Sequence, residues 1–330
     1  MCTSERTRWE GKSRSCFVRW LGLSSLLIWL ILLAGGESSA RTPTRRVSRP
    51  GSCYAFLRRA SLWTTCEGKR ERIQLGVRVD DFAVSVDGSH LVFHKHKEDP
   101  SGDSIMPNSG GSHLTVISLG DKTGVTAINV EEAGRLSATC GTVVHFEFWS
   151  RHALDALTAA PLRLPPYQYF RCSSDRRSIV GWTEQDDAER RKRAESDMTA
   201  IESITLRTGQ SGETTVASIY GPPTFDISPN GEFVSYFTWL PGKQEGLCVA
   251  RASGSPRCVS DGGHVISLAN NGDVIFWSPN EDSSDIRYWH LGSPQTVLLE
   301  KGASNPQWIT PEAAARLHEW NERAQHPEQH

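Results

Sequence analysis

The chain has 330 residues, of which 38% are hydrophobic and 22% are charged. This is the composition of an ordinary globular protein rather than of a disordered chain. The formal net charge of −2 leaves no surplus of Lys and Arg to neutralise phosphates, which argues against a dedicated nucleic-acid-binding protein.

The first forty residues differ in pattern from the rest of the chain. A basic stretch precedes residues 20–34, which run for fifteen positions without a charge. A membrane-spanning helix needs about 20 apolar residues, whereas a shorter run suits the core of a signal peptide. The small residues Ser38 and Ala40 follow, as a signal peptidase requires. We therefore expect a hydrophobic helix within a signal peptide over residues 1–40.

An uncleaved signal anchor is the alternative for the same segment. The apolar run lengthens if it starts at Phe17, since only Arg19 then interrupts it, and residues 17–34 would become a membrane tether. Arginines in the linker that follows, residues 41–51, weaken the Lys/Arg asymmetry that fixes topology. Both interpretations predict export.

Cysteine usage points to the same compartment. Of the eight cysteines, the six beyond the leader form no CxxC pair and have no histidine at zinc spacing. An even set of this kind favours disulfides and an oxidising environment, so we expect a periplasmic or extracellular protein. The six are Cys53, Cys66, Cys140, Cys172, Cys248 and Cys258.

A self-similar pattern runs along the mature chain. It appears in residues 82–93 (FAVSVDGSHLVF) and recurs in residues 225–236 (FDISPNGEFVSY) and 266–277. Apolar residues two positions apart define one face of a strand, and Asp-Gly or Asn-Gly between two such strands makes a tight hairpin. A further copy at 170–182 has Arg176 where the others have the turn glycine.

Each hairpin is followed by further strand-like segments. The clearest are residues 246–250 and 257–259, on either side of a polar turn. Four strands per unit is the content of a propeller blade, and the 41 residues from Gly231 to Gly272 match the repeat of about 40–45. A degenerate unit is expected over residues 136–149.

The two ends of the repeat region are expected to meet. Residues 305–312 have the pattern of an opening strand, and residues 52–75 contain strands without a unit of their own. Strands from both ends would then share the last blade and close the ring. We predict an all-β fold, a β-propeller of four-stranded blades over residues 52–312, with six blades or, alternatively, five. A helical tail is predicted over residues 313–330.

The hairpin motif, the later segment LCVARASGSPRCVS at residues 247–260 and the repeat spacing resemble the TolB-like, WD40-like (PD40-type) β-propeller repeat family. The similarity is strongest at 225–260 and 264–300 and weak at 120–150. The resemblance implies a propeller fold and an interaction role. It implies no catalytic residue and no cofactor.

Two stretches do not fit a strand. Residues 97–111 are rich in Gly, Ser and Pro and are expected to form an exposed loop. Residues 184–197 carry acidic residues and a run of basic ones, and we expect a solvated loop or a short helix inserted in a blade.

Three neighbouring histidines, His90, His94 and His96, raise the question of a metal site. His94 and His96 would point to the same face of a strand, but spacing fixes no third ligand. A solvent-exposed strand end is expected there, and no metal site is predicted.

No catalytic site is predicted either. The sequence contains neither the nucleophile elbow G-x-S-x-G nor a Gly-rich phosphate loop. Asp80-Asp81 and Asp186-Asp187 are adjacent pairs, and on a strand neighbouring side chains face opposite ways, so they do not make an acid–base pair by themselves.

The chain has eleven tryptophans, many for its length. Those in or beside repeat strands are expected to fill the spaces between blades, and others could lie there or at the rim. A ligand-stacking role stays open for any of them. The first group is Trp149, Trp182, Trp277 and Trp308; the second is Trp239 and Trp289.

The cysteine positions within the hairpins predict specific disulfides. A turn at residues 252–255 would fold Cys248 opposite Cys258, close enough for a disulfide; two buried free thiols are the alternative. The same logic pairs Cys53 with Cys66, which leaves Cys140 with Cys172.

These features together predict a non-catalytic, monomeric protein-binding or scaffold module of the cell envelope, with a protein partner and no nucleic acid. The alternatives are an enzyme that acts on small or glycan substrates through the propeller channel, and a membrane-tethered sensor domain. Charged and histidine side chains converging on the channel mouth would favour the enzyme, and an apolar or mixed channel would favour binding.

Overall fold

The computed structural model describes residues 53–95, 112–120, 124–130, 134–147, 152–183, 188, 192, 204–208, 214–219, 224–240, 244–251, 255–279 and 284–325. The chain divides into two units, Met1–Arg46 and Val47–His330. The predicted leader with its hydrophobic helix, the loop at 97–111 and all of 184–197 except Ala188 and Lys192 lie outside the described residues. No helix in the described part of the chain is long and apolar enough to cross a membrane.

The part of the second unit that the structure describes forms six antiparallel sheets, which we number as blades in chain order. The first blade is β4 (Val79–Val84), β5 (His90–Lys95), β6 (Ser112–Ser118) and β7 (Val125–Val130). The second is β8 (Gly134–Thr139), β9 (Thr142–Glu147) and β10 (Ala153–Asp155). The third is β11 (Tyr167–Cys172), β12 (Ile179–Thr183), β13 (Ile204–Thr208) and β14 (Thr214–Ile219).

The fourth blade is β15 (Phe225–Ile227), β16 (Phe233–Leu240), β17 (Gln244–Arg251) and β18 (Arg257–Val259). The fifth is β19 (Val265–Leu268), β20 (Val274–Pro279), β21 (Ser284–Trp289) and β22 (Val297–Lys301). The closing blade joins β23 (Ser304–Ile309) to β1 (Cys53–Arg58), β2 (Ser61–Cys66) and β3 (Lys69–Ile73).

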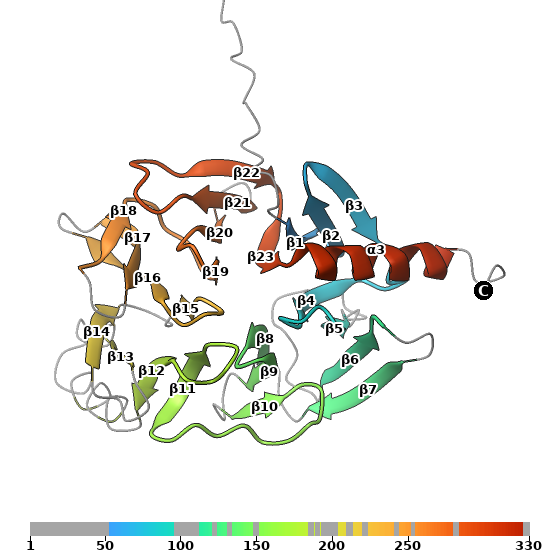
Figure 1. Cartoon of the computed structure of the whole chain (residues 1–330), viewed down its shortest axis with the longest axis horizontal. Coiled ribbons are helices and arrows are strands. Elements are labelled where there is room, and N and C mark those ends of the chain that lie inside the picture. The colour runs from blue at the N-terminus through green and yellow to red at the C-terminus, as the bar shows by residue number, and fades with distance from the viewer. Residues whose placement is uncertain are drawn as a thin grey trace, which may run out of the picture. The chain divides into compact units, whose positions relative to one another are not determined.

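The sheets are arranged as a ring (Figure 1). The strand that begins each sheet, called its inner strand here, contacts inner strands of neighbouring sheets: β4 with β8, β11 with β15, β15 with β19, β19 with β23 and β23 with β4. The predicted all-β propeller is therefore confirmed. Within the described residues it has five four-stranded blades and a three-stranded second blade.

The repeated Ser-x-Asp/Asn-Gly motif closes the hairpin between the inner strand and the next strand. In the first blade, the Ser85 hydroxyl donates to Asp87 Oδ1 at 2.6 Å and accepts from the His90 N–H at 2.9 Å, while Gly88 has φ of 67°. A left-handed residue at this point is what favours glycine. Arg176 takes the same conformation, with φ of 60°, in the third blade. The serine-to-acceptor bond recurs in Ser173–Asp175 and Ser228–Asn230.

The second blade departs from the predicted four strands. Beyond its short strand β10, the chain turns back so that the Asp155 N–H donates to Ala160 O at 2.9 Å and the Leu162 N–H donates to Ala153 O at 2.7 Å. Pro161 lies between these two bonds, opposite Leu154. Proline has no N–H to give to a ladder and is confined to sheet edges. The segment thus covers β10 without forming a fourth strand.

Strands from both ends of the repeat region share one sheet, as the sequence predicts. Strand β23 pairs with β1, so that Ile309 lies opposite Cys53 and Trp308 opposite Tyr54. The buried carboxylate of Glu300 on β22 accepts a hydrogen bond from the Tyr54 hydroxyl at 3.2 Å. Arg58 and Arg70 also bind this carboxylate. The fifth and closing blades are therefore linked by a charged cluster as well as by packing.

A C-terminal helix, α3 (Pro311–Gln325), follows directly on β23. Ala313 and Leu317 are buried in the apolar cluster between the closing and first blades. The Asn321 side chain accepts from the Gln74 N–H at 2.7 Å and donates to Arg72 O at 3.1 Å. These contacts fasten the helix beside β3.

All three predicted disulfides are present. Cys248 lies directly opposite Cys258 between β17 and β18, with Cα atoms 4.1 Å apart. The Cys53–Cys66 bond joins β1 to β2 in the same way, with a Cα separation of 4.2 Å. The third bond, Cys140–Cys172, joins two different blades, with a Cα separation of 4.7 Å.

Candidate functional site: polar residues of the inner strands

An inner strand is a sheet edge, and its outer N–H groups need partners that its own sheet does not supply. Side chains from the preceding inner strand provide them. Asp81 Oδ2 on β4 accepts from the Leu136 N–H on β8 at 2.8 Å. Asp226 Oδ2 on β15 accepts from the Leu268 N–H on β19 at 3.0 Å.

The same arrangement recurs with uncharged side chains. The Ser267 hydroxyl accepts from the Trp308 N–H at 2.9 Å. Gln307 holds both main-chain groups of Val84, accepting from its N–H at 2.8 Å and donating to its carbonyl at 2.6 Å. We call Asp81, Thr139, Asp226, Ser267 and Gln307 the inner-strand caps.

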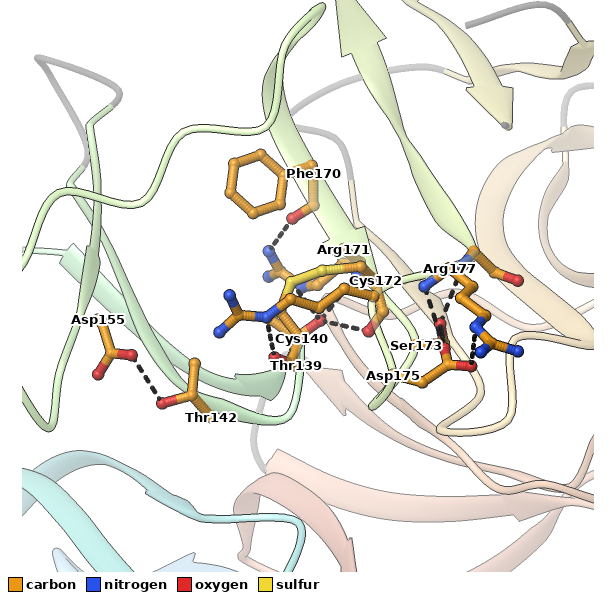
Figure 2. Close-up of a disulfide and its surroundings, with 12 residues drawn as sticks. Thr139, Cys140, Thr142, Asp155, Phe170, Arg171, Cys172, Ser173, Asp175 and Arg177 are labelled. Carbon is orange, nitrogen blue, oxygen red and sulfur yellow. Dashed lines mark hydrogen bonds and ion pairs between the residues drawn. A yellow bond between two sulfur atoms is a disulfide. The ribbon is translucent and has the colours of Figure 1, made fainter. Parts of the chain in front are cut away.

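The remaining cap, Thr139, lies at the junction of the second and third blades (Figure 2). Its hydroxyl donates to Cys172 O at 3.0 Å and accepts from the Cys172 N–H at 2.9 Å. The disulfide of Cys172 with Cys140 lies beside it, and the Arg176 side chain donates to Cys140 O at 2.8 Å. A covalent bond and a side-chain cap therefore hold the same two inner strands.

Arg171 is the buried cation of this junction. Its guanidinium donates to Phe170 O at 3.0 Å and to the Tyr169 hydroxyl at 2.9 Å. The guanidinium carbon lies 4.3 Å from the ring centroid of Phe146, a residue of the neighbouring blade. This is cation–π geometry, so the charge is held between aromatic rings of two blades.

Burial sets the proton affinity of the two carboxylate caps. It raises the pKa of Asp81 to about 6, against the opposing effect of the Leu136 N–H. Burial also raises the pKa of Asp226 to about 6, although the positive charge of Arg171 acts in the other direction. Carboxyls of this kind exchange protons close to neutral pH, as a general acid or base must.

Their hydrogen bonds, however, tie these carboxylates to the scaffold. Asp81 Oδ1 accepts from the Phe82 N–H at 2.9 Å and from the Asn305 side chain at 3.2 Å, while Oδ2 is bound to Leu136. The geometry therefore serves to join neighbouring blades. The sequence interpretation of Asp80-Asp81 missed this role, and the available signal was a pair of acids on a strand whose other residues are apolar.

In the part of the chain that the structure describes, the histidines considered as metal ligands are not brought together. His90 Nδ1 lies 2.7 Å from the Ser89 hydroxyl, and His96 is outside the described residues. His94 is buried rather than exposed, and it lies against His145 of the second blade. Within the described ranges, no three His, Cys, Asp or Glu side chains form a group that could hold a metal ion.

The tryptophans largely follow the packing that the sequence predicts. Trp182 is buried and packs edge-on against Phe225 of the fourth blade, with ring centroids 5.8 Å apart. Trp308 meets Tyr54 and Tyr288 edge-on in the cluster between the fifth and closing blades. Trp289 is buried, and its N–H donates to Ser293 O. Trp277 lies beside His264. Trp149, the Trp239 side chain and the pair Asp186-Asp187 lie outside the described residues.

Comparison with known proteins agrees with this architecture. The sequence matches no protein-family model, and no curated protein is similar to it in sequence. TolB from Acinetobacter baumannii has a similar structure, with a TM-score of 0.55 and 11% identity, over 78% of this chain. The match covers 66% of that TolB chain, slightly less than two thirds of its length.

Two further similar structures come from other proteins. The β-propeller domain of the Trilobed protease from Pyrococcus furiosus is 13% identical with a TM-score of 0.41, over 76% of this chain and 95% of that one. The Pyrococcus horikoshii acylaminoacyl peptidase is 10% identical with a TM-score of 0.37, over 67% and 38%. The similarity to TolB from Acinetobacter baumannii shows that the fold is that of a TolB-like β-propeller.

Proposed function

We propose that this protein is an exported β-propeller that binds a protein partner in the cell envelope through one end of its ring and acts there as a non-catalytic scaffold. The observation that carries this proposal is that the polar groups of the inner strands form hydrogen bonds between blades. Both carboxylate caps, the two with a pKa near that of a general acid or base, accept main-chain N–H groups of the next blade. The inner strands thus serve as a rigid support, and we assign recognition of the partner to the loops.

The hairpin turns beside the inner strands gather at one end of the ring. The Ser174 N–H donates to Pro229 O and the Asn230 N–H to Asn270 Oδ1, both at 2.8 Å, so turns of the third, fourth and fifth blades touch one another. We call this the turn end, formed by residues 85–89, 173–178, 228–232 and 269–273. The turn end carries exposed charges, among them Arg177, whose side chain is 85% exposed. We assign the binding of the partner to this end of the ring.

Two features support export. The leader has the apolar core and the small residues before position 41 that a signal peptide needs. Three disulfides join the mature part, and such bonds persist in oxidising compartments. A protein that works as a monomer outside the cytoplasm gains rigidity from cross-links of this kind.

Site-specific photo-crosslinking in cells tests where the partner binds. A photoreactive residue is placed at Arg177 or Glu232 on the turn end and, as matched exposed controls on outer strands, at Lys69 or Val125. Discrete crosslinked envelope protein bands are expected from the first two positions and not from the controls. Crosslinks from the outer strands alone would place binding on the rim and contradict the assignment.

A further inference from the structure

Two buried histidines face each other at the seam between the first and second blades. His94 on β5 is 8% exposed and His145 on β9 is 0% exposed, and their ring centroids are 5.1 Å apart. Nε2 of His94 and both ring nitrogens of His145 have no hydrogen-bond partner. Most buried polar atoms in proteins are hydrogen-bonded, so these three unpaired nitrogens are unusual.

The nearest neighbours in the sheets are mainly apolar. His145 lies between Leu136 on β8 and Leu154 on β10. His94 lies between Asp81 on β4 and Leu114 on β6. An imidazolium among these side chains would lose hydration, which is unfavourable for a buried charge. The one carboxylate among these four neighbours, Asp81, already accepts from the Leu136 and Phe82 N–H groups.

The strands that carry the pair and those beside them hold eight other charged or titratable side chains. Asp80 on β4 raises the pKa of His94, but burial is the larger effect and lowers it to about 4. Burial, assisted by His94, lowers the pKa of His145 to about 3. Asp81 is bound to the Leu136 N–H. The others are His90 and Lys95 on β5, His113 on β6, Arg135 on β8, Asp155 on β10 and Glu147 on β9, which also contacts His152.

We propose that the His94–His145 pair is an acid-sensitive latch, which keeps the seam between the first two blades closed while both rings are neutral and opens it when either ring is protonated. The two rings come from different blades, and three of their four ring nitrogens are buried without a hydrogen-bond partner. Opening would hydrate both rings, and the remaining blades keep their own cores and disulfides.

The direction of the pH effect follows from linkage. Histidines whose pKa is lowered in the closed state stabilise that state fully above about pH 6.5, and the stabilisation is lost as the pH falls toward 4. Each histidine makes opening up to about tenfold more favourable per pH unit in this window. Asp81 acts oppositely, because its raised pKa favours the closed state as the pH falls below 6. Two imidazoles with larger shifts outweigh this one carboxyl.

Native-state hydrogen exchange of the full, oxidised chain at pH 7.5 and 4.5 tests the latch, after correction for the intrinsic pH dependence of exchange. We expect β4, β5, β8 and β9 to lose at least about tenfold in protection at pH 4.5 relative to β16 and β17. The double variant His94→Phe/His145→Phe keeps ring volume without a titratable proton, so its seam should lose no protection. His113→Gln, at an exposed position on β6, is the matched control and should behave as the unmodified chain.

Nuclear magnetic resonance titration of the two imidazoles supplies a measurement that does not depend on the double variant folding. Midpoints well below pH 6 support the latch. Midpoints near 6.5, or an acid-induced loss of protection that is the same in the double variant, would overturn it.

Discussion

Single polar side chains complete the hydrogen bonding of the inner strands. The caps replace, from the neighbouring blade, the partners that a further strand would provide. The sequence revealed neither Asp81 as a cap nor the contact of His145 with His94, because both contacts run between blades and no local pattern encodes which residues of two sheets meet. Alternation within a strand predicts a face, not the neighbour on it.

Gln307 offers the simplest test of a cap. Replacing it in Gln307→Ala leaves both main-chain groups of Val84 without the partner they have now. We expect a loss of about 1–3 kcal/mol in the free energy of unfolding, the usual effect of leaving buried polar groups unpaired. Urea unfolding measures it. Gln295→Ala, at an exposed turn, is the matched control and should change stability little; an equal effect of both variants contradicts the capping role.

Asp226 predicts a pH dependence of definite sign. Because burial raises the pKa of its carboxyl to about 6, the folded state favours the proton, so the ionised group destabilises the fold above pH 6 and this effect fades as the pH falls toward 3.8. Asp226→Asn removes the titration. The stability of this variant relative to the unmodified chain should therefore be higher at pH 7.5 than at pH 4.5, as measured by urea unfolding at both values.

Asp175→Asn is the control for this experiment. Hydrogen bonds from Ser173 and the Arg177 N–H lower the pKa of the Asp175 carboxyl, so that group is ionised at both pH values. Its relative stability should be the same at 7.5 and 4.5. A pH-independent difference for Asp226→Asn as well would show that burial does not control that carboxyl.

At the scale of the element, the hairpins were predictable and the second blade was not. Asp-Gly and Asn-Gly fix the turn because glycine accepts the left-handed conformation, and the facing cysteines follow from the strand register. Arg176 shows that the conformation persists without glycine. Pro161 was a signal against a fourth strand in the second blade. The prediction of four strands there rested instead on the repeat of the other blades.

The turn of the first blade also positions α3, and a pair of glycine variants separates the two effects. Gly88 and Gly68 both have positive φ, so alanine should cost about 1 kcal/mol of stability at either position. A Cβ at Gly88 would lie 2.6 Å from Ala313 of α3, whereas one at Gly68 meets nothing within 4 Å. We expect Gly88→Ala alone to lose a further 1–3 kcal/mol, about the usual cost of overpacking, and to increase hydrogen exchange in α3.

At the scale of the whole molecule, cross-links of two kinds stabilise the ring. Cys140–Cys172 closes 32 residues between two blades, whereas Cys248–Cys258 closes 10 within one blade. By the entropy of loop closure, replacing the first pair by serines should cost about 3–4 kcal/mol and replacing the second about 2–3 kcal/mol. Equilibrium unfolding of the two double variants gives the order, and a reversed order would show that strain or residual structure dominates.

One measurement tests the proposed export and the disulfide-bonded ring together most directly. The protein is recovered from the envelope fraction of cells that express the full chain, its N-terminus is sequenced, and its cysteines are mapped without reduction. We predict a chain that begins at Arg41, with Cys53 linked to Cys66, Cys140 to Cys172 and Cys248 to Cys258. A chain that begins at Met1 in the soluble cytoplasmic fraction, with its cysteines in unlinked peptides, would contradict it.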